Sequence, residues 1–298
     1  MLGRLFVHLI RKSIVLKYAF WLAVGLASLT SCGGPTESVA VAEDNPSTSP
    51  ANLLNGVEVQ FDRLSASPAA APQKVLDSAA ASVLYRSVAA HGVDKYRTGH
   101  YGFTFREKAY VIRNQGQHLV YARTYEKDGM MVADSLVNGD FSKHIDGQLA
   151  KLTAKETAVG REDLNSVIYF ATLPDKLRDP AVNLIALPSV TINGQAYDAF
   201  GVNFDVEGGG TDHDDNFVYW VNAQTDRIDF LAYDYRTNGS GVRFRKAYNP
   251  RIVGGTLFQD YVNYKAEVGT ALTDLPALFE QGALKKLSLI ETEDVEVL

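Results

Sequence analysis

The segment GGGTDHDD, residues 208–215, concentrates side chains that can bind ligands or transfer protons. Asp212, His213, Asp214 and Asp215 offer carboxylate and imidazole groups of the kind that manganese, zinc or calcium take as ligands. Their spacing matches neither the acidic calcium loop nor the zinc-binding helix motif, and only a tight turn, which the preceding glycines permit, can aim all four side chains at one ion. Three interpretations stay open: a hydrated hairpin loop, a hydrogen-bonded ligand or partner site, and a divalent metal site. Apart from this candidate metal, the sequence predicts no cofactor.

Arginines placed within expected strands form a second group of candidates. A positive charge that faces a half-buried cavity needs either an acid or an anionic ligand. We expect internal acids such as Asp229 and Asp234 to supply the pairing, with an anionic ligand as the alternative. The candidate residues are Arg106, Arg123, Arg243 and Arg245.

Two more residues are candidates for a cavity wall. His91 precedes Gly92 at the end of an apolar helical pattern, where an imidazole can interact with the last carbonyls, so we expect a structural role. Trp220 follows Tyr219 in a strand-like run. Large aromatic side chains in a curved sheet form core or line a cavity for a hydrophobic ligand.

The amino terminus has the layout of a lipoprotein signal. Basic residues precede an apolar run over residues 18–29, and the run ends in Leu29-Thr30-Ser31-Cys32. The run is shorter than the roughly twenty residues of a membrane-spanning helix. We therefore predict a cleaved signal peptide over residues 1–31 and acylation of Cys32, the single cysteine of the chain.

Composition divides the remainder into two parts. Residues 32–72 are rich in Pro, Ser, Ala and Gly and are predicted to be a flexible tether, whereas residues 73–298 are predicted to be a single β-rich domain. Without residues 1–31 the chain has 25 basic and 35 acidic side chains, a formal net charge of −10. This charge, with no long basic run, excludes nucleic acid as an expected partner.

Alternating apolar residues predict consecutive antiparallel strands. Phe103–Arg113 and His118–Glu126 are expected to pair as a hairpin, and Asn193-Gly194 is the turn of a second hairpin. Within the strand that follows this turn, Phe200, Val202 and Phe204 are expected on one face. Further strands are predicted in FVYWVN, IDFLAYDYR, GVRFRKAY and DYVNYKAEV.

Helical spacing is found in three places. Lys74–Ala90 is predicted to be a helix that ends at His91-Gly92, Asp163–Leu177 a helix interrupted by Pro174, and a short helix is expected from Thr273 or Asp274 to Gly282. Strands thus outnumber helices. We predict an α+β, mainly β fold: one large curved antiparallel sheet, a half-barrel, with a few helices on its concave face or at its ends.

Several motifs together resemble a family of uncharacterised bacterial lipoproteins, a domain of unknown function. They are HG (91–92), FTFR (103–106), NSVIYF with LP (165–174), GGGTDHDD with FVYW (208–220), DFLAY (229–233), RFR (243–245) and DYVNY (260–264). The resemblance runs from about Lys74 to the C-terminus and assigns no catalytic residue. The strand-rich layout is in turn similar to half-barrel carriers such as LolA and LolB, in which a bent sheet closed by helices holds acyl chains.

These observations lead to one preferred hypothesis and two alternatives. We expect a lipoprotein anchored by Cys32 in the bacterial envelope, at the outer membrane, that binds a small hydrophobic or amphiphilic ligand in a half-barrel cavity. The alternatives are a metal-assisted envelope hydrolase that uses residues 208–215, and a structural or interaction subunit of an envelope complex. Because no nucleophile elbow, phosphate loop or dinucleotide motif is found, we lean towards a protein without enzymatic activity.

Overall fold

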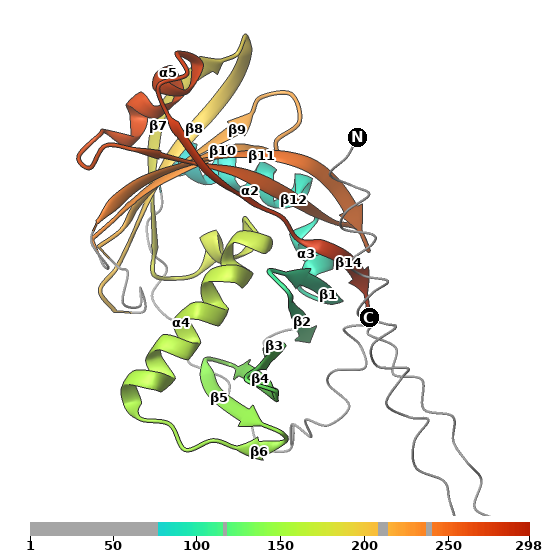
Figure 1. Ribbon diagram of the computed structural model, residues 1–298. Helices are drawn as coiled ribbons and strands as arrows, with labels where there is room; N and C mark the ends of the chain where they lie inside the picture. The colour runs from blue at the N-terminus through green and yellow to red at the C-terminus, as the bar shows by residue number, and fades with distance from the viewer. Residues whose placement is uncertain (1–76, 116–117, 208–213, 237–239) are drawn as a thin grey trace, which may run out of the picture. The chain divides into compact units, whose positions relative to one another are not determined.

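The computed structural model describes residues 77–115, 118–207, 214–236 and 240–298 (Figure 1). All of them belong to one compact unit, Pro46–Leu298. In the described ranges, the core clusters and the strand pairs are formed by residues of this unit alone. A unit with its own hydrophobic core can fold independently. None of the helices in the described ranges is long and apolar enough to span a membrane.

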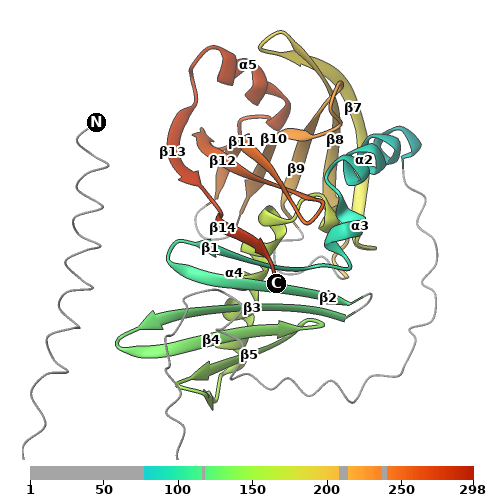
Figure 2. The same cartoon turned by 90° about the vertical axis from the view of Figure 1, so that its right-hand side faces the viewer.

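The strands form two antiparallel sheets, each described with seven strands, that we call sheet A and sheet B (Figures 1 and 2). In spatial order, sheet A consists of β14 (Glu293–Val297), β1 (His100–Phe105), β2 (Lys108–Gln115), β3 (His118–Lys127), β4 (Met130–Val137), β5 (Asp140–Ile145) and β6 (Gln148–Leu149). Sheet B consists of β13 (Lys285–Ile290), β12 (Thr256–Ala266), β11 (Gly241–Val253), β10 (Ile228–Tyr235), β9 (Asn216–Asn222), β8 (Gln195–Phe204) and β7 (Val182–Ile192).

The two sheets are connected through the C-terminal segment. β13 pairs with β12 at the edge of sheet B, and β14, which follows it directly, pairs with β1 at the edge of sheet A. The link between them is held by the Asp260 carboxylate, which accepts the amide hydrogen of Thr292 at 3.0 Å, and by Arg251, which lies 3.0 Å from the same carboxylate. One chain segment thus contributes an edge strand to each sheet.

Helices pack against the faces of both sheets. α2 (Ser78–Ala90) and the short α3 (Val93–Tyr96) precede sheet A, η2 (Asp175–Arg178) precedes sheet B, and η4 (Leu272–Asp274) with α5 (Leu275–Glu280) precede β13. α4 (Ala154–Ala171) runs from the outer strands of sheet A to sheet B (Figure 1). Sheet B is covered on both faces, by α2 over Phe200 and Tyr219 and by α5 over Trp220 and Phe244.

The predicted fold class is confirmed: the protein is mainly β, antiparallel and open, with few helices. The strands are divided into two connected sheets where one sheet was expected. The Asn193-Gly194 hairpin is present, with positive φ at both residues, and Phe200 and Val202 share a core face as predicted. The helix predicted to end at His91-Gly92 is α2, within the described residues.

Two predictions about element boundaries are wrong. Phe103–Arg113 is not one strand, because Arg106 and Glu107 both adopt positive φ and turn the chain between β1 and β2. The second helix begins at Ala154, where Thr153 accepts a hydrogen bond from the Glu156 amide and Glu156 reciprocates. It ends at Ala171, ahead of Pro174.

Candidate functional site

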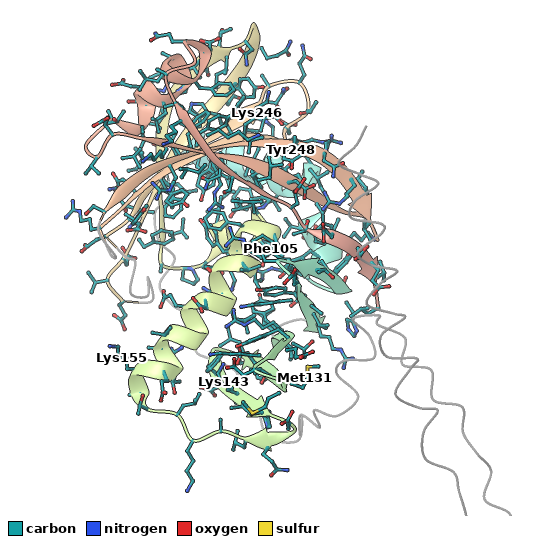
Figure 3. All side chains as sticks on the ribbon, in the orientation of Figure 1. Phe105, Met131, Lys143, Lys155, Lys246 and Tyr248 are labelled. Atoms are coloured by element: carbon teal, nitrogen blue, oxygen red, sulfur yellow. The ribbon has the colours of Figure 1, made fainter. Side chains whose placement is uncertain are left out.

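A cavity of about 190 Å³, open to solvent, lies between α4 and the inner face of sheet B. Four separate segments build it: the β1–β2 turn, the C-terminal half of α4, strands β11 and β12, and the β13–β14 link. Figure 3 shows Phe105 beside the C-terminal half of α4. The lining residues are Phe105, Arg106, Ser166, Val167, Phe170, Ala171, Arg245, Gln259, Tyr261, Ile290 and Thr292.

α4 forms one wall of this cavity because its buried stripe fixes its position. Gly160, Leu164 and Ile168, at spacings of four residues, face the core, and the last two are fully buried. Gly160 is needed for close packing, since a Cβ there would lie 2.3 Å from the ring of Phe141 on β5. Held this way, α4 directs Phe170 onto sheet B, where its ring lies 5.8 Å from that of Tyr233.

Arg245 is the charged residue of the inner wall. It lies on β11, directly opposite Leu231 of β10 and Asn263 of β12, and only 7% of it is exposed. Its Cζ atom lies 3.7 Å from the centre of the Phe170 ring, a cation–π contact, and its Nη2 donates a hydrogen bond of 2.8 Å to the Tyr233 hydroxyl. Nε and Nη1 are buried without a hydrogen-bond partner among the described residues.

The phenol and amide side chains around Arg245 are neutral. Burial raises the pKa of Tyr261 to about 12, and burial likewise raises the pKa of Tyr169 and Tyr219, so the three phenols stay protonated at physiological pH. The Gln259 amide donates to the Ile228 carbonyl at 2.8 Å and to the Tyr261 hydroxyl at 3.1 Å. The cavity lining therefore contains two arginines and no acid.

Arg106 is the second arginine of the lining and marks the mouth of the cavity. It is exposed and lies in the β1–β2 turn, with its guanidinium 5.0 Å from the centre of the Phe105 ring. The FTFR segment thus contributes an apolar wall and a solvent-facing cation from adjacent positions. A ligand that inserts an apolar part would leave its polar end near this turn or near Arg245.

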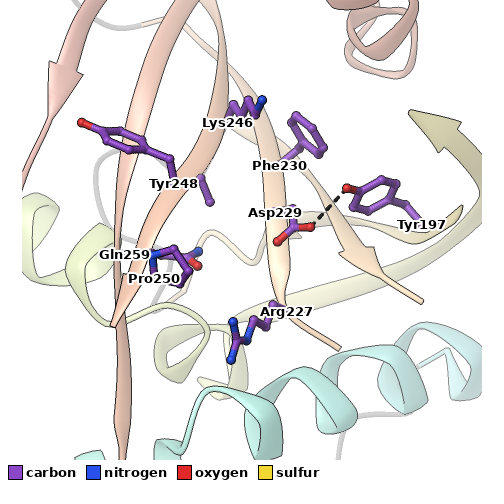
Figure 4. Close-up of a pocket in the computed structure, with 9 residues that line it drawn as sticks. Tyr197, Arg227, Asp229, Phe230, Lys246, Tyr248, Pro250 and Gln259 are labelled. Carbon is purple, nitrogen blue, oxygen red and sulfur yellow. Dashed lines mark hydrogen bonds between the residues drawn. The ribbon is translucent and has the colours of Figure 1, made fainter. Parts of the chain in front are cut away.

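Two further cavities accompany the first. One of about 740 Å³ lies along the opposite flank of α4, between Ala158, Arg161, Glu162 and Asn165 of the helix and Tyr121 and Leu136 of sheet A. Another of about 170 Å³ lies at sheet B and contains Arg227, Lys246 and Asp229, whose carboxylate accepts the Tyr197 hydroxyl at 3.1 Å (Figure 4). Gln259 lines this cavity as well as the one with Arg245.

Residues 84–292 match the model of a protein family described as a family of unknown function, DUF6503. The chain belongs to this family. The match spans most of the chain, so the resemblance to an uncharacterised family is confirmed. No curated protein matches the chain.

Three solved structures are similar to this DUF6503 protein. A LolA superfamily protein from Nitrosomonas europaea has 10% identity and a TM-score of 0.44, covering 74% of this chain and 93% of that one. A DUF1329 family protein from Desulfovibrio piger has 8% identity and a TM-score of 0.41, covering 74% and 94%. A putative outer membrane lipoprotein-sorting protein domain from Vibrio parahaemolyticus has 9% identity and a TM-score of 0.31, covering 70% and 93%.

The structure brings two of the predicted arginines, Arg106 and Arg245, to the cavity along α4 and leaves the other two elsewhere. Arg123 is buried on β3 and lies 2.8 Å from the carboxylate of Asp134. Arg243 donates to the Tyr235 hydroxyl and to the Val242 carbonyl. The acids expected to pair with the arginines have other partners.

Asp229 and Asp234 are those acids. The Asp229 carboxylate accepts from Tyr197 and from Asn222, and the Asp234 carboxylate accepts from Asn216. The contacts with Asn222 and Asn216 join the neighbouring strands β10 and β9, and the contact with Tyr197 reaches β8, the next strand of sheet B. Among the described residues an internal acid does pair with Arg123, but it is Asp134, and neither Asp229 nor Asp234 pairs with one of the four arginines.

His91 and Trp220 lie in the core, away from the described cavities. His91 caps the C-terminus of α2, and its Nε2 accepts the amide hydrogen of Ile228 at 3.1 Å. Burial, with a smaller contribution from Arg227, lowers the pKa of His91 to about 4, so the imidazole is neutral. Gly92 follows in the left-handed region, where a Cβ would lie 2.0 Å from the Gly255 carbonyl oxygen. Trp220 packs against Phe244.

The acidic segment is only partly described. Asp214 is exposed and Asp215 is buried at the start of β9, while Asp212 and His213 lie outside the described residues, as does Cys32. No group of three or more His, Cys, Asp or Glu side chains suited to a metal is found in the described ranges. The metal site, the hydrolase that would use it and the acylation of Cys32 stay predictions.

The sequence did not identify Phe170, Gln259, Tyr261 and Thr292 as site residues, although all four line the cavity. Phe170 lies near the C-terminal end of α4, and the hydroxyl of its neighbour Tyr169 forms a hydrogen bond with the Tyr219 hydroxyl. The sequence contains the arginines of RFR and the aromatic end of NSVIYF, but it does not show that they meet. Only the three-dimensional contact between these motifs shows that they form one site.

Proposed function

We propose that this DUF6503 protein binds a small apolar or amphiphilic molecule in the cavity between α4 and strands β11 and β12. The observation that carries the proposal is the composition of the cavity wall. Phe105, Val167, Phe170, Ala171 and Ile290, from segments far apart in the sequence, surround one open space. A few polar groups among apolar walls are typical of small-molecule sites.

The size of the cavity sets the size of the buried part of the ligand. Apolar cavities of about 150 Å³ admit benzene or xenon. At about 190 Å³ this cavity holds a single ring or a short stretch of alkyl chain. Because it is open to solvent, the remainder of a longer ligand extends past Arg106 into water or along the outside of α4.

α4 supports a carrier role because it separates two cavities. Ser166, Val167, Phe170 and Ala171 line the smaller cavity, and the larger one, about 740 Å³, begins at the opposite flank of the same helix. Gly160, at the closest approach of α4 to β5, fixes how deeply the helix sits.

The proposal also places the protein in the bacterial envelope. The order of basic residues, apolar run and Leu-Thr-Ser-Cys supports acylation of Cys32, and Gly33 after the cysteine supports transport to the outer membrane. The tether over residues 33–72 would then hold the binding domain away from the lipid surface. Exchange of an amphiphile with that membrane is the role that this arrangement suits.

A neutral fluorescent probe tests binding separately from any charge preference. N-phenyl-1-naphthylamine becomes bright in apolar surroundings, and we expect Pro46–Leu298 to bind it at one site. Ala171→Trp places an indole in the cavity and should weaken probe binding by about tenfold or more, since the apolar space is filled. Ala158→Trp, on the opposite flank of α4, is the matched control and should bind as the unaltered protein does.

Two results would contradict the proposed function. The unaltered protein would fail to enhance the fluorescence of the probe, or Ala171→Trp would bind it as tightly as the unaltered protein. Circular dichroism of each variant establishes that its fold is retained. Weaker binding by Ala158→Trp alone would move the ligand site to the larger cavity.

A further inference from the structure

Arg245 is a buried cation whose charge is not balanced by the residues around it. Two of its three guanidinium nitrogens, Nε and Nη1, lack a hydrogen-bond partner among the described residues, and the side chain forms no ion pair there. A buried charge is costly unless it is paired and hydrogen-bonded. Arginine keeps its charge in proteins, so the imbalance cannot be removed by loss of a proton.

The acids of the neighbouring elements have other partners: Asp179 lies 3.6 Å from Lys176, and Asp229 accepts from Tyr197 and Asn222. Asp260 on β12 pairs with Arg251 and accepts hydrogen bonds from Asn249 and Thr292. Asp163 on α4 is 63% exposed at its side chain and lies 3.7 Å from Arg123. None of these acids forms an ion pair with Arg245 in the part of the chain that the structure describes, so an anionic ligand can balance its charge.

We propose that the ligand is an anionic amphiphile of the carboxylate class whose head group accepts hydrogen bonds from Arg245 while its apolar part lies against Phe170, Phe105 and Ile290. This inference rests on the proposed function and specifies the ligand of that site. One buried guanidinium matches one negative charge, which favours a carboxylate over a doubly charged phosphate. The lining offers no acid that would repel the head group.

The contacts of Arg245 hold it ready for such a head group. Phe170 covers one face of the guanidinium. The centre of the Tyr233 ring lies 5.2 Å from Cζ of Arg245, and the Tyr233 hydroxyl accepts a hydrogen bond from Nη2. These contacts fix the side chain before the ligand binds, so little side-chain entropy is lost on binding. Ser166 and Thr292 also line the cavity, but their hydroxyls donate to the Asp163 carbonyl and to the Asp260 carboxylate, so the charge-assisted contacts come from Arg245.

Calorimetric titration of Pro46–Leu298 with decanoate, decanol and decyl phosphate tests the inference. These probes share one alkyl chain and differ in the head group. We expect decanoate to bind at least about tenfold more tightly than decanol, as charge-assisted hydrogen bonds allow. In Arg245→Met this preference should fall to about twofold or less while decanol binding is retained, because methionine keeps the apolar contact with Phe170.

Arg243→Met is the matched control. Arg243 lies on the same strand and face, two residues away, but does not line the cavity, so this variant should keep the preference for decanoate. Equal affinity of the unaltered protein for decanoate and decanol would overturn the carboxylate assignment and leave the proposed function standing. Absence of binding by all three probes would overturn both. Tighter binding of decyl phosphate would replace the carboxylate class with phosphate.

A measurement on the unaltered protein covers the case in which Arg245→Met fails to fold. In decanoate labelled with carbon-13 at the carboxyl, the pKa of the bound carboxyl should lie below that of free decanoate, because the neighbouring guanidinium stabilises the ionised form. The carbon shift followed against pH reports this pKa. A bound carboxyl that titrates at or above the free value would contradict contact with Arg245.

Discussion

Arg123 on β3 and Arg245 on β11 are both buried arginines on sheet faces that contact α4, yet their cross-strand neighbours differ. Arg123 lies directly opposite Asp134, and Asp134 lies directly opposite Lys143, whose ammonium is 2.7 Å from the same carboxylate. Arg245 lies opposite Leu231 and Asn263. The charge of Arg123 is paired within the chain, whereas the residues that the structure describes form no ion pair with Arg245.

The comparison separates two uses of a buried charge. On sheet A, Asp134 is fully buried and joins three adjacent strands through Arg123 and Lys143, so the cluster specifies strand register. On sheet B, the neighbours of Arg245 hold the guanidinium by stacking and one hydrogen bond, and two of its nitrogens have no hydrogen-bond partner within the described ranges. The first cluster belongs to the fold, and the second belongs to the site.

Removal of the acid on sheet A should have the largest effect on stability. Asp134→Ala leaves the buried Arg123 and the half-buried Lys143 beside each other without the carboxylate that they share, so we expect the free energy of unfolding to fall by about 3–5 kcal/mol. Urea denaturation measures the change. Asp140→Ala, on the exposed start of β5, is the control and should change stability by less than about 0.5 kcal/mol. A loss below about 1 kcal/mol for Asp134→Ala would remove the structural role assigned to the cluster.

His91 extends the comparison to a buried base that is kept neutral. Its pKa of about 4 in the folded protein lies below the ordinary value of 6.5, so the unfolded chain binds the proton more readily between these values. Stability from this group is complete above pH 6.5 and declines as the pH falls towards 4, by on the order of 3 kcal/mol in total.

The pH dependence of unfolding in His91→Gln isolates this contribution. Glutamine can accept the Ile228 amide hydrogen but has no proton to gain, so the variant should lose less stability than the unaltered protein between pH 6.5 and pH 4. Identical pH profiles for the two proteins would show that His91 does not remain neutral in the fold.

The smallest stability change is expected on sheet B. In Arg245→Met the loss of the stacking and of the bond to Tyr233 is offset by the removal of an unbalanced buried charge, so the free energy of unfolding should change by less than about 1 kcal/mol. The same urea series used for Asp134→Ala checks this. A loss of about 3 kcal/mol or more would make Arg245 a structural residue and remove the contrast with Arg123.

Local sequence patterns were sufficient for much of sheet B. Alternation of apolar residues identified strands around Phe200 and Trp220, and the Asn193-Gly194 pair fixed a hairpin because both residues accept positive φ. The β1–β2 turn was missed since Arg106-Glu107 is not a usual turn pair, although both residues adopt positive φ. The start of α4 was missed although Thr153 and Glu156 have the spacing of a capping box.

The candidate site was harder to predict than the fold. Arg106 and Arg245 were identified as cavity candidates by their charge within strands, and both line the cavity. Their relation to Phe170 and Thr292 depends on how α4 and the β13–β14 link pack across the sheets, and these contacts join residues far apart in the chain. No local pattern shows that Arg123 has an acid opposite it and Arg245 has none, because that depends on strand register.

A crystal structure of Pro46–Leu298 grown with decanoate tests the central claim most directly. We predict a single decanoate with its alkyl chain between α4 and strands β11 and β12, and a carboxylate oxygen within hydrogen-bond distance of Nε or Nη1 of Arg245. A structure in which side chains fill this space, or in which decanoate binds only elsewhere, would contradict the account.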